Sequence, residues 1–81
     1  MDDIRRGKIQ SIVRLLAELQ EQVHELWLDE EVKFEARSVA SKESSAGTLS
    51  QEAMGHLENT VAHIEEAKFE LNSACDVRSG P

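Results

Sequence analysis

The chain has 81 residues and a formal net charge of -7, with 40% hydrophobic and 31% charged residues. At this size a single core rarely supplies more than about 3 to 5 kcal/mol without a disulfide, a metal or a partner chain. The single cysteine excludes an internal disulfide and fits a reducing compartment. We therefore expect one domain that is stabilised by association with another chain.

Charge and hydropathy exclude further function classes. Residues 25–76 carry twelve acidic and four basic side chains, whereas residues 1–24 carry four of each. A nucleic-acid site along the whole molecule would need a basic face, which this distribution does not provide. No apolar run approaches the roughly 20 residues of a membrane span, and the N-terminus lacks the apolar core of a signal peptide. We expect a cytoplasmic protein that binds neither membrane nor nucleic acid.

The first predicted helix spans residues 7–40, with a frayed start because Gly7 costs about 1 kcal/mol inside a helix. Apolar residues recur along it with a spacing of three and four, which we assign to heptad positions a and d. These residues are Ile9, Ile12, Leu16, Leu19, Val23 and Leu26. In this register Val13, Trp27 and Phe34 fall at position e and widen the apolar face, which suits a bundle of several helices.

This register fails after Trp27, because the next a and d positions are Glu30 and Lys33. Apolar residues continue on another face, at Leu28 and Val32. Either the helix bends around its partner or its second half meets a different chain. We favour the different chain, because Leu28 would otherwise be left in water.

A serine-rich connector is predicted at residues 41–48, before a second helix at residues 49–76. Residues 38–50 hold five serines, one threonine and one glycine, which removes periodicity and favours turns and caps. Thr48 and Gln51 have the spacing of a capping box, and Gly47 just before them supplies a free backbone angle. The tail at residues 77–81 is expected to be disordered.

The second helix has one narrow apolar stripe, which Lys68 alone interrupts. The stripe consists of Met54, Leu57, Val61, Ile64, Leu71 and Cys75. We expect Cys75 to be buried in it, and Lys68 to set the register or the oligomeric state. A stripe on one side only needs a partner helix, so the two helices predict an all-α, antiparallel two-helix hairpin over residues 1–76.

Several hairpins are then expected to assemble into an oligomeric helical bundle, at least a homodimer, because apolar residues occupy more than one face of the first helix. We predict that the interface uses the residues of both stripes and their neighbours. These residues are Leu16, Leu19, Val23, Leu26, Trp27, Leu28, Leu57, Val61, Ile64 and Leu71.

No catalytic residue, metal site or cofactor is expected. Glu21 and His24 have the Glu-x-x-His spacing of di-iron bundles, but the register places both on the outer face, whereas such ligands project into the core. His56 and His63 lie about 10.5 Å apart along a helix, too far to share one ion within a chain. The sequence therefore favours a protein that is not an enzyme.

A ligand site is a separate hypothesis. Four basic residues lie near the N-terminus: Arg5, Arg6, Lys8 and Arg14. They form either a solvated face that complements Glu65, Glu66 and Glu70, or a phosphate site where several chains bring their arginines together. We expect Trp27 to be a packed interface anchor. The alternative is that it serves as a platform on which a ligand stacks.

Five pieces of the sequence form a recognisable pattern: Arg5-Arg6, the run LAELQEQVHEL, Asp29-Glu30-Glu31 followed by Phe34-Glu35, the serine-rich connector, and SQEA followed by LENTVAHIEEA. In these pieces, and so over nearly its whole length, the chain resembles a family of short phage and prophage proteins. Family members often have an Asn-Leu-Pro type turn after the phenylalanine. This chain has Ala36-Arg37-Ser38-Val39 instead, so its first helix is expected to run longer.

The resemblance implies a small helical accessory protein without catalytic residues. By analogy with other phage proteins, it implies sequestration of a host factor, with a nucleotide-derived antiviral signal as the most concrete ligand. The alternative is a structural or protein-binding coiled coil whose acidic face, at Glu30 and Glu31, engages a basic host protein.

Overall fold

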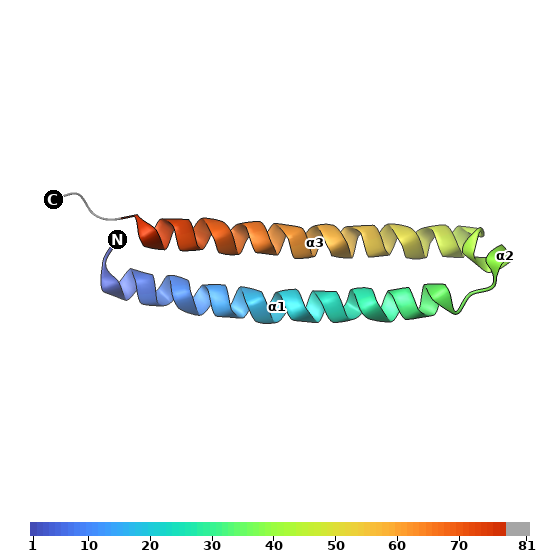
Figure 1. Cartoon of the computed structure of the whole chain (residues 1–81), viewed down its shortest axis with the longest axis horizontal. Helices are drawn as coiled ribbons and strands as arrows, with labels where there is room; N and C mark the ends of the chain where they lie inside the picture. Colours follow the sequence, from blue (N-terminus) through green and yellow to red (C-terminus); the bar gives the residue numbers. More distant parts are fainter. Residues whose placement is uncertain (78–81) are drawn as a thin grey trace.

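The computed structural model describes residues 1–77, which form three helices and no strand. Helix α1 spans Asp3–Glu35, α2 spans Val39–Lys42 and α3 spans Ser45–Asp76. Figure 1 shows α1 and α3 side by side in opposite directions, with α2 at the far end from both termini. The predicted antiparallel helical hairpin is thus confirmed, whereas residues 78–81 of the predicted disordered tail lie outside the described residues.

The hairpin is a rod rather than a compact domain. Its extents are 65 × 17 × 12 Å and its radius of gyration is 18.4 Å. A compact domain of this length would have a radius of gyration of about 12 Å. One layer of two helices therefore exposes both of its faces along the whole length.

Helix α1 begins and ends earlier than the sequence predicts. The Asp2 side chain caps it by accepting a hydrogen bond from the Arg5 backbone N–H at 2.8 Å. With Asp3 in the first turn, this carboxylate cap stabilises the helix start and offsets the cost of Gly7. The helix stops at Glu35, so the expectation of a longer first helix is wrong.

Serine side chains set the starts of the next two helices. Ser38 caps α2 by accepting from the Ser41 N–H at 3.2 Å, and Ser44 caps α3 by accepting from the Gly47 N–H at 3.3 Å. Thr48 lies inside α3 and donates to the Ser44 carbonyl instead. The predicted capping box at Thr48 is therefore wrong, and α3 starts four residues earlier than expected.

Gly47 is needed for close approach and not for an unusual backbone angle. No residue among 1–77 has a positive φ, so the predicted free backbone angle is also wrong. A Cβ at position 47 would lie 2.1 Å from the Lys42 carbonyl oxygen, a contact that atoms do not make. The end of α2 thus lies directly on the first turns of α3, and only glycine leaves room for it.

The contact between α1 and α3, here called the seam, follows a regular heptad on both helices. Its members are buried or half-buried. On α1 they are Ile9, Val13, Leu16, Gln20, Val23, Trp27, Glu30 and Phe34, and on α3 they are Gly47, Ser50, Met54, Leu57, Val61, Ile64, Lys68, Leu71 and Cys75. The predicted α3 stripe is confirmed, including the place of Lys68 within it.

The predicted register of α1 is correct at Ile9, Leu16 and Val23 and wrong at the positions that alternate with them. Ile12, Leu19 and Leu26 are 44%, 50% and 57% exposed, and the seam passes one residue later, through Val13, Gln20 and Trp27. The seam also does not break after Trp27, because Glu30 accepts a hydrogen bond from the Ser50 hydroxyl and Phe34 continues the contact. Two polar residues, Gln20 and Glu30, are thus part of a stripe that the apolar pattern alone does not reveal.

No hydrophobic residue among 1–77 is fully buried. Two helices in contact leave each apolar seam side chain open on at least one flank, because closing a core needs further helices around it. The apolar seam of a single chain is therefore only partly covered.

Candidate functional site

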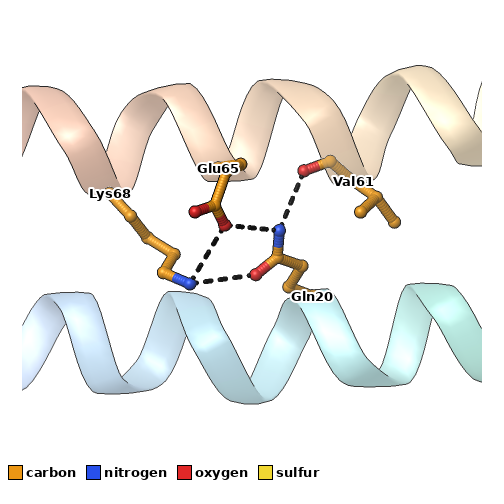
Figure 2. Close-up of polar contacts among 4 residues, drawn as sticks. All are labelled: Gln20, Val61, Glu65 and Lys68. Atoms are coloured by element: carbon orange, nitrogen blue, oxygen red, sulfur yellow. Dashed lines mark hydrogen bonds and ion pairs between the residues drawn. The ribbon is translucent and has the colours of Figure 1, made fainter.

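A polar cluster crosses the middle of the seam (Figure 2). The Gln20 amide nitrogen donates to the Val61 carbonyl at 3.1 Å and to the Glu65 carboxylate at 2.9 Å. Lys68 Nζ donates to the Gln20 side-chain oxygen and to Glu65, each at 3.1 Å. A shift of α3 by one turn would break the three of these bonds that cross the seam, so the cluster fixes the register of the hairpin.

This cluster also changes the acidity of Glu65. The hydrogen bond from Gln20, then the hydrogen bond and charge of Lys68, lower the pKa of the Glu65 carboxyl below its ordinary value of 4.5. Glu65 thus remains a carboxylate to lower pH than an isolated glutamate would. Its charge is directed toward one flank of the hairpin.

The seam divides the hairpin into two unlike sides. On the side called the acidic side, residues that follow seam positions line three hollows, two of them shared by both helices and one on α3 alone. These residues include His24, Glu31, Gln51, Glu58 and Glu65. On the other side, called the apolar side, lie residues that precede seam positions, namely Ile12, Leu19 and Leu26 from α1 and Ala53, Thr60, Ala67 and Ala74 from α3.

Trp27 lies between two hollows of the acidic side. Its ring stacks on His24 with a centroid distance of 5.9 Å and an interplanar angle of 7°. One hollow of about 250 Å³ is lined by Trp27, His24, Glu58 and Val61. The next, of about 360 Å³, extends from Trp27 and Glu58 along the connector end of the seam. Aromatic surface and carboxylates are therefore combined at one place.

The Trp27 indole N–H is buried and has no hydrogen-bond partner among residues 1–77. A buried donor left unpaired costs about 1 to 3 kcal/mol. Trp27 in the seam therefore lowers the stability of the hairpin by this free energy, whereas an aliphatic residue has no donor to leave unpaired. Trp27 is half-buried between α1 and α3, and its role as an interface anchor between chains stays a prediction.

A third hollow of the acidic side surrounds Phe69. It measures about 600 Å³ and is lined by Phe69, Ala62 and the carboxylates of Glu65, Glu66 and Glu70. Phe69 is 68% exposed, which is unusual for a large aromatic side chain without a partner. Phe69 was not among the predicted site residues, because it lies outside the apolar stripe of α3. The spacing of residues along a helix does not show whether an aromatic side chain is exposed.

The four predicted basic ligand residues do not form one site with Trp27. Arg6 donates from Nε to the Cys75 carbonyl at 3.0 Å and lines a hollow of about 410 Å³ with Gln10, Cys75 and Asp76. Arg5 lies 3.8 Å from Asp2, while Lys8 and Arg14 are exposed. Trp27 is 21 residues beyond Arg6, or about 31 Å along the helix. The expected pairing of these bases with Glu65, Glu66 and Glu70 is replaced, for Arg5 and Arg6, by ion pairs to Asp2 and Asp3.

The ten predicted interface residues fall into two groups. Seven lie half-buried in the seam: Leu16, Val23, Trp27, Leu57, Val61, Ile64 and Leu71. The other three, Leu19, Leu26 and Leu28, are exposed. Leu19 and Leu26 belong to the apolar side, with Leu15 (58% exposed) at its rim, whereas Leu28 follows Trp27 on the other flank. Cys75 is free and half-buried at the terminal end of the seam.

No group of three metal-ligating side chains comes together within residues 1–77, and Glu21 and His24 are both exposed. None of the described helices is long and apolar enough to cross a membrane. No protein-family model, curated protein or solved structure matches the chain. The surfaces of the hairpin are therefore the features that indicate what it binds.

Proposed function

We propose that this chain is a non-catalytic, self-associating binding protein, whose acidic side sequesters a partner protein by holding a positively charged segment of it. The observation that carries the proposal is the pair of aromatic side chains, Trp27 and Phe69, each beside carboxylates at a hollow of the surface. A site of this kind suits a lysine or arginine side chain.

The physical basis is the combination of ring and carboxylate. A cation over an aromatic face is attracted by the ring quadrupole, and a neighbouring carboxylate adds a charge-assisted hydrogen bond. Glu58 lies beside Trp27, and Glu65, Glu66 and Glu70 lie around Phe69. The same carboxylates would repel a phosphate, so this side favours a basic partner over an anionic ligand.

The spacing of the hollows defines the partner further. The hollow of Trp27 is lined on α3 by Glu58 and Val61, and that of Phe69 by residues from Ala62 to Glu70. The centres of the two hollows thus lie about seven residues apart along α3, or about 10 Å. An extended segment of about three residues spans this distance. We therefore infer a segment with two basic residues about three positions apart.

Self-association is the second part of the proposal. It is supported by the absence of any fully buried hydrophobic residue among 1–77, and by the exposed leucines of the apolar side. A pair of hairpins would supply the helices that complete a bundle core. It would also present two acidic sides facing outward, one on each hairpin.

A ten-residue peptide rich in lysine and arginine tests the acidic side, with its glutamate counterpart as the negative probe. Trp27 is the only tryptophan, so its fluorescence reports binding directly. The double substitution Glu31→Gln and Glu58→Gln should weaken binding about tenfold or more, because two charge contacts are lost.

The matched control is Glu18→Gln with Glu25→Gln, which removes the same charge from the exposed outer surface of α1. Its affinity should stay within about twofold of the original, since long-range attraction is screened by salt. Equal weakening by both pairs would show attraction by net charge only. That outcome would remove the proposed site.

A nucleotide-derived ligand is the second candidate. It is favoured by the hollow of about 410 Å³ beside Arg6, with Arg5 and Lys8 in the same two turns. Arginine forks bind phosphate bidentately, and an oligomer would bring several such ends together. Calorimetry with cyclic nucleotides, on the original chain and on Arg5→Ala with Arg6→Ala, tests this candidate. Binding that survives both substitutions would exclude the site.

A further inference from the structure

We propose that the apolar side is the docking surface for a second copy of this chain, in a four-helix bundle whose two hairpins point the same way. In this bundle α1 of each hairpin lies on α3 of the other. The inference rests on the self-association proposed above and adds which surface is used and in which orientation.

The exposed area fits an occupant of this size. The chain exposes 6123 Å². A compact monomer of 9.1 kDa would expose about 4,900 Å² by the scaling of folded proteins. The excess of roughly 1,200 Å² exceeds the 800 Å² or so that each partner buries in a stable interface of standard size. A second hairpin laid along the rod can therefore cover the surface that a single chain leaves open.

Charge decides which side the second copy covers. Pairing two acidic sides would remove the carboxylates of Glu31, Glu58 and Glu65 from water on both chains. The desolvation of a carboxylate that gains no basic partner costs several kcal/mol. The apolar side carries no acidic residue in its central stretch between Ile12 and Leu26 on α1, or between Ala53 and Ala67 on α3, at the positions that precede the seam. Only the apolar side is self-complementary.

The register of the hairpin shows which residues meet. Hydrogen bonds across the seam show the register: the residue numbers add to 80 or 81 for Arg6 to Cys75, Gln20 to Val61 and Ser50 to Glu30, to 85 for Gln20 to Glu65 and to 88 for Lys68 to Gln20. On the apolar side, Ile12 therefore lies within about one turn of Ala67, Leu19 of Thr60, and Leu26 of Ala53. Each large side chain of α1 has a small side chain of α3 close to its own level.

A two-fold axis along the rod places α1 of one copy on α3 of the other at equal levels. Leu19 then meets Thr60 of the second copy, and large side chains meet small ones at every layer, which is how well-packed bundle cores interdigitate. An axis across the rod would instead place Leu19 on Leu19 and Thr60 on Thr60. The helices would then be forced to unequal spacings, wide at the leucines and narrow at the alanines.

The rim of the apolar side supplies an ion pair in the proposed arrangement. Lys8 and Glu70 occupy corresponding rim positions on α1 and α3, lie at about the same level of the rod and are exposed, and Glu70 also lines the hollow around Phe69. When the hairpins point the same way, Lys8 of each copy approaches Glu70 of the other. With the axis across the rod, Lys8 would approach the acidic stretch beside Asp29 of the second copy, and Glu70 would approach the levels of Leu49 and Ala53. Both arrangements give Lys8 an acidic partner, but only the first gives Glu70 a basic one.

Disulfide trapping distinguishes the two arrangements. In a Cys75→Ser background, chains carrying Leu19→Cys are mixed with isotope-labelled chains carrying Thr60→Cys in a glutathione redox buffer. One cysteine per chain prevents an internal bond, and products are identified by mass. A disulfide needs Cα atoms within about 7 Å, so only facing positions link efficiently. The mixed control is Glu18→Cys with Asn59→Cys, at the same level on the outer surfaces.

The expected result is a mixed Leu19→Cys and Thr60→Cys dimer, in a yield about ten times that of the control, because facing thiols are held together. Self-linking of Leu19→Cys chains in preference would overturn the proposed orientation. A mass near 9 kDa by light scattering at micromolar concentration, for the original chain, would overturn the docking itself. Neither outcome affects peptide binding to the acidic side, so failure here is distinct from failure of the proposed partner site.

Discussion

The two sides of the hairpin differ by a step of only two residues around the helix, yet their chemistry is opposite. Residues that precede seam positions along the middle of the rod are mostly leucine, isoleucine, alanine and threonine, with Gln22, His56 and His63 but no acidic residue, whereas those that follow include His24, Glu31, Glu58 and Glu65. A seam between two helices cannot close a core, so the flanks determine what else the hairpin binds. In the arrangement proposed above, the one apolar flank is covered within a single closed pair, which leaves the other flank for a different partner.

The largest expected effect on self-association comes from a charge placed on the apolar side. Leu19→Asp would bury two carboxylates near the axis of the pair, because each copy contributes one. We expect a loss of about 2 kcal/mol or more in dimerisation, roughly 30-fold in Kd. Sedimentation or light scattering should show the change from about 18 kDa to the 9.1 kDa of one chain.

Val32→Asp is the matched control for this prediction. Val32 is 68% exposed on α1 but lies away from the apolar side. Its substitution should leave the mass of the assembly unchanged. Dissociation by both substitutions would show that apolar exposure as such, and not the apolar side, drives association.

A change of pH tests how much Glu65, on the acidic side, contributes to the stability of the hairpin. Because the pKa of Glu65 is lowered in the folded chain, its contribution to stability is complete above the ordinary value of 4.5 and is lost as the pH falls through the lower folded value. Thermal unfolding of the original chain should therefore decline more steeply below pH 4.5 than that of Glu65→Gln. The neighbouring substitution Glu66→Gln, which removes a carboxylate paired with His63 on the same helix, should keep the original slope.

The smallest expected effect is at the rim. Lys8→Glu or Glu70→Lys alone should weaken dimerisation by about twofold to fivefold, as exposed ion pairs contribute about 0.2 to 1 kcal/mol. The two together should restore it at low salt, and about 0.5 M salt should remove the difference. Failure of the double substitution to recover the affinity would contradict the pairing of these two residues.

The fold could be predicted from the sequence to the extent that one stripe dominates a helix. On α3 the apolar residues lie on the seam, so its face was predicted correctly. On α1 they are divided between the seam and the apolar side, and Ile12, Leu19 and Leu26 misled the assignment. The true seam contains Gln20 and Glu30, whose partners lie on α3, and such pairing across helices leaves no periodic signal.

The site was less predictable than the fold for a related reason. Trp27 was predicted to be an anchor because tryptophan is rare and lies beside the apolar stripe. The hollows around Trp27 depend on the packing of α3 against α1 and on the absence of a side chain at Gly55. Neither feature can be recognised from the sequence. In the connector, Ser44 and Thr48 are equally good caps by composition, and the contact of Gly47 with Lys42 decides between them.

The antiparallel register also has a consequence for the order in which the hairpin assembles. Pairs across the seam are 20 residues apart at Ser50 and Glu30, 41 at Gln20 and Val61, and 69 at Arg6 and Cys75. Closing the longest of these loops costs about 1 kcal/mol more in chain entropy than closing the shortest. The contacts between α1 and α3 are therefore expected to form first near the connector and last near the termini. Amide hydrogen exchange should be fastest where Arg6 meets Cys75, because this contact forms last and opens first.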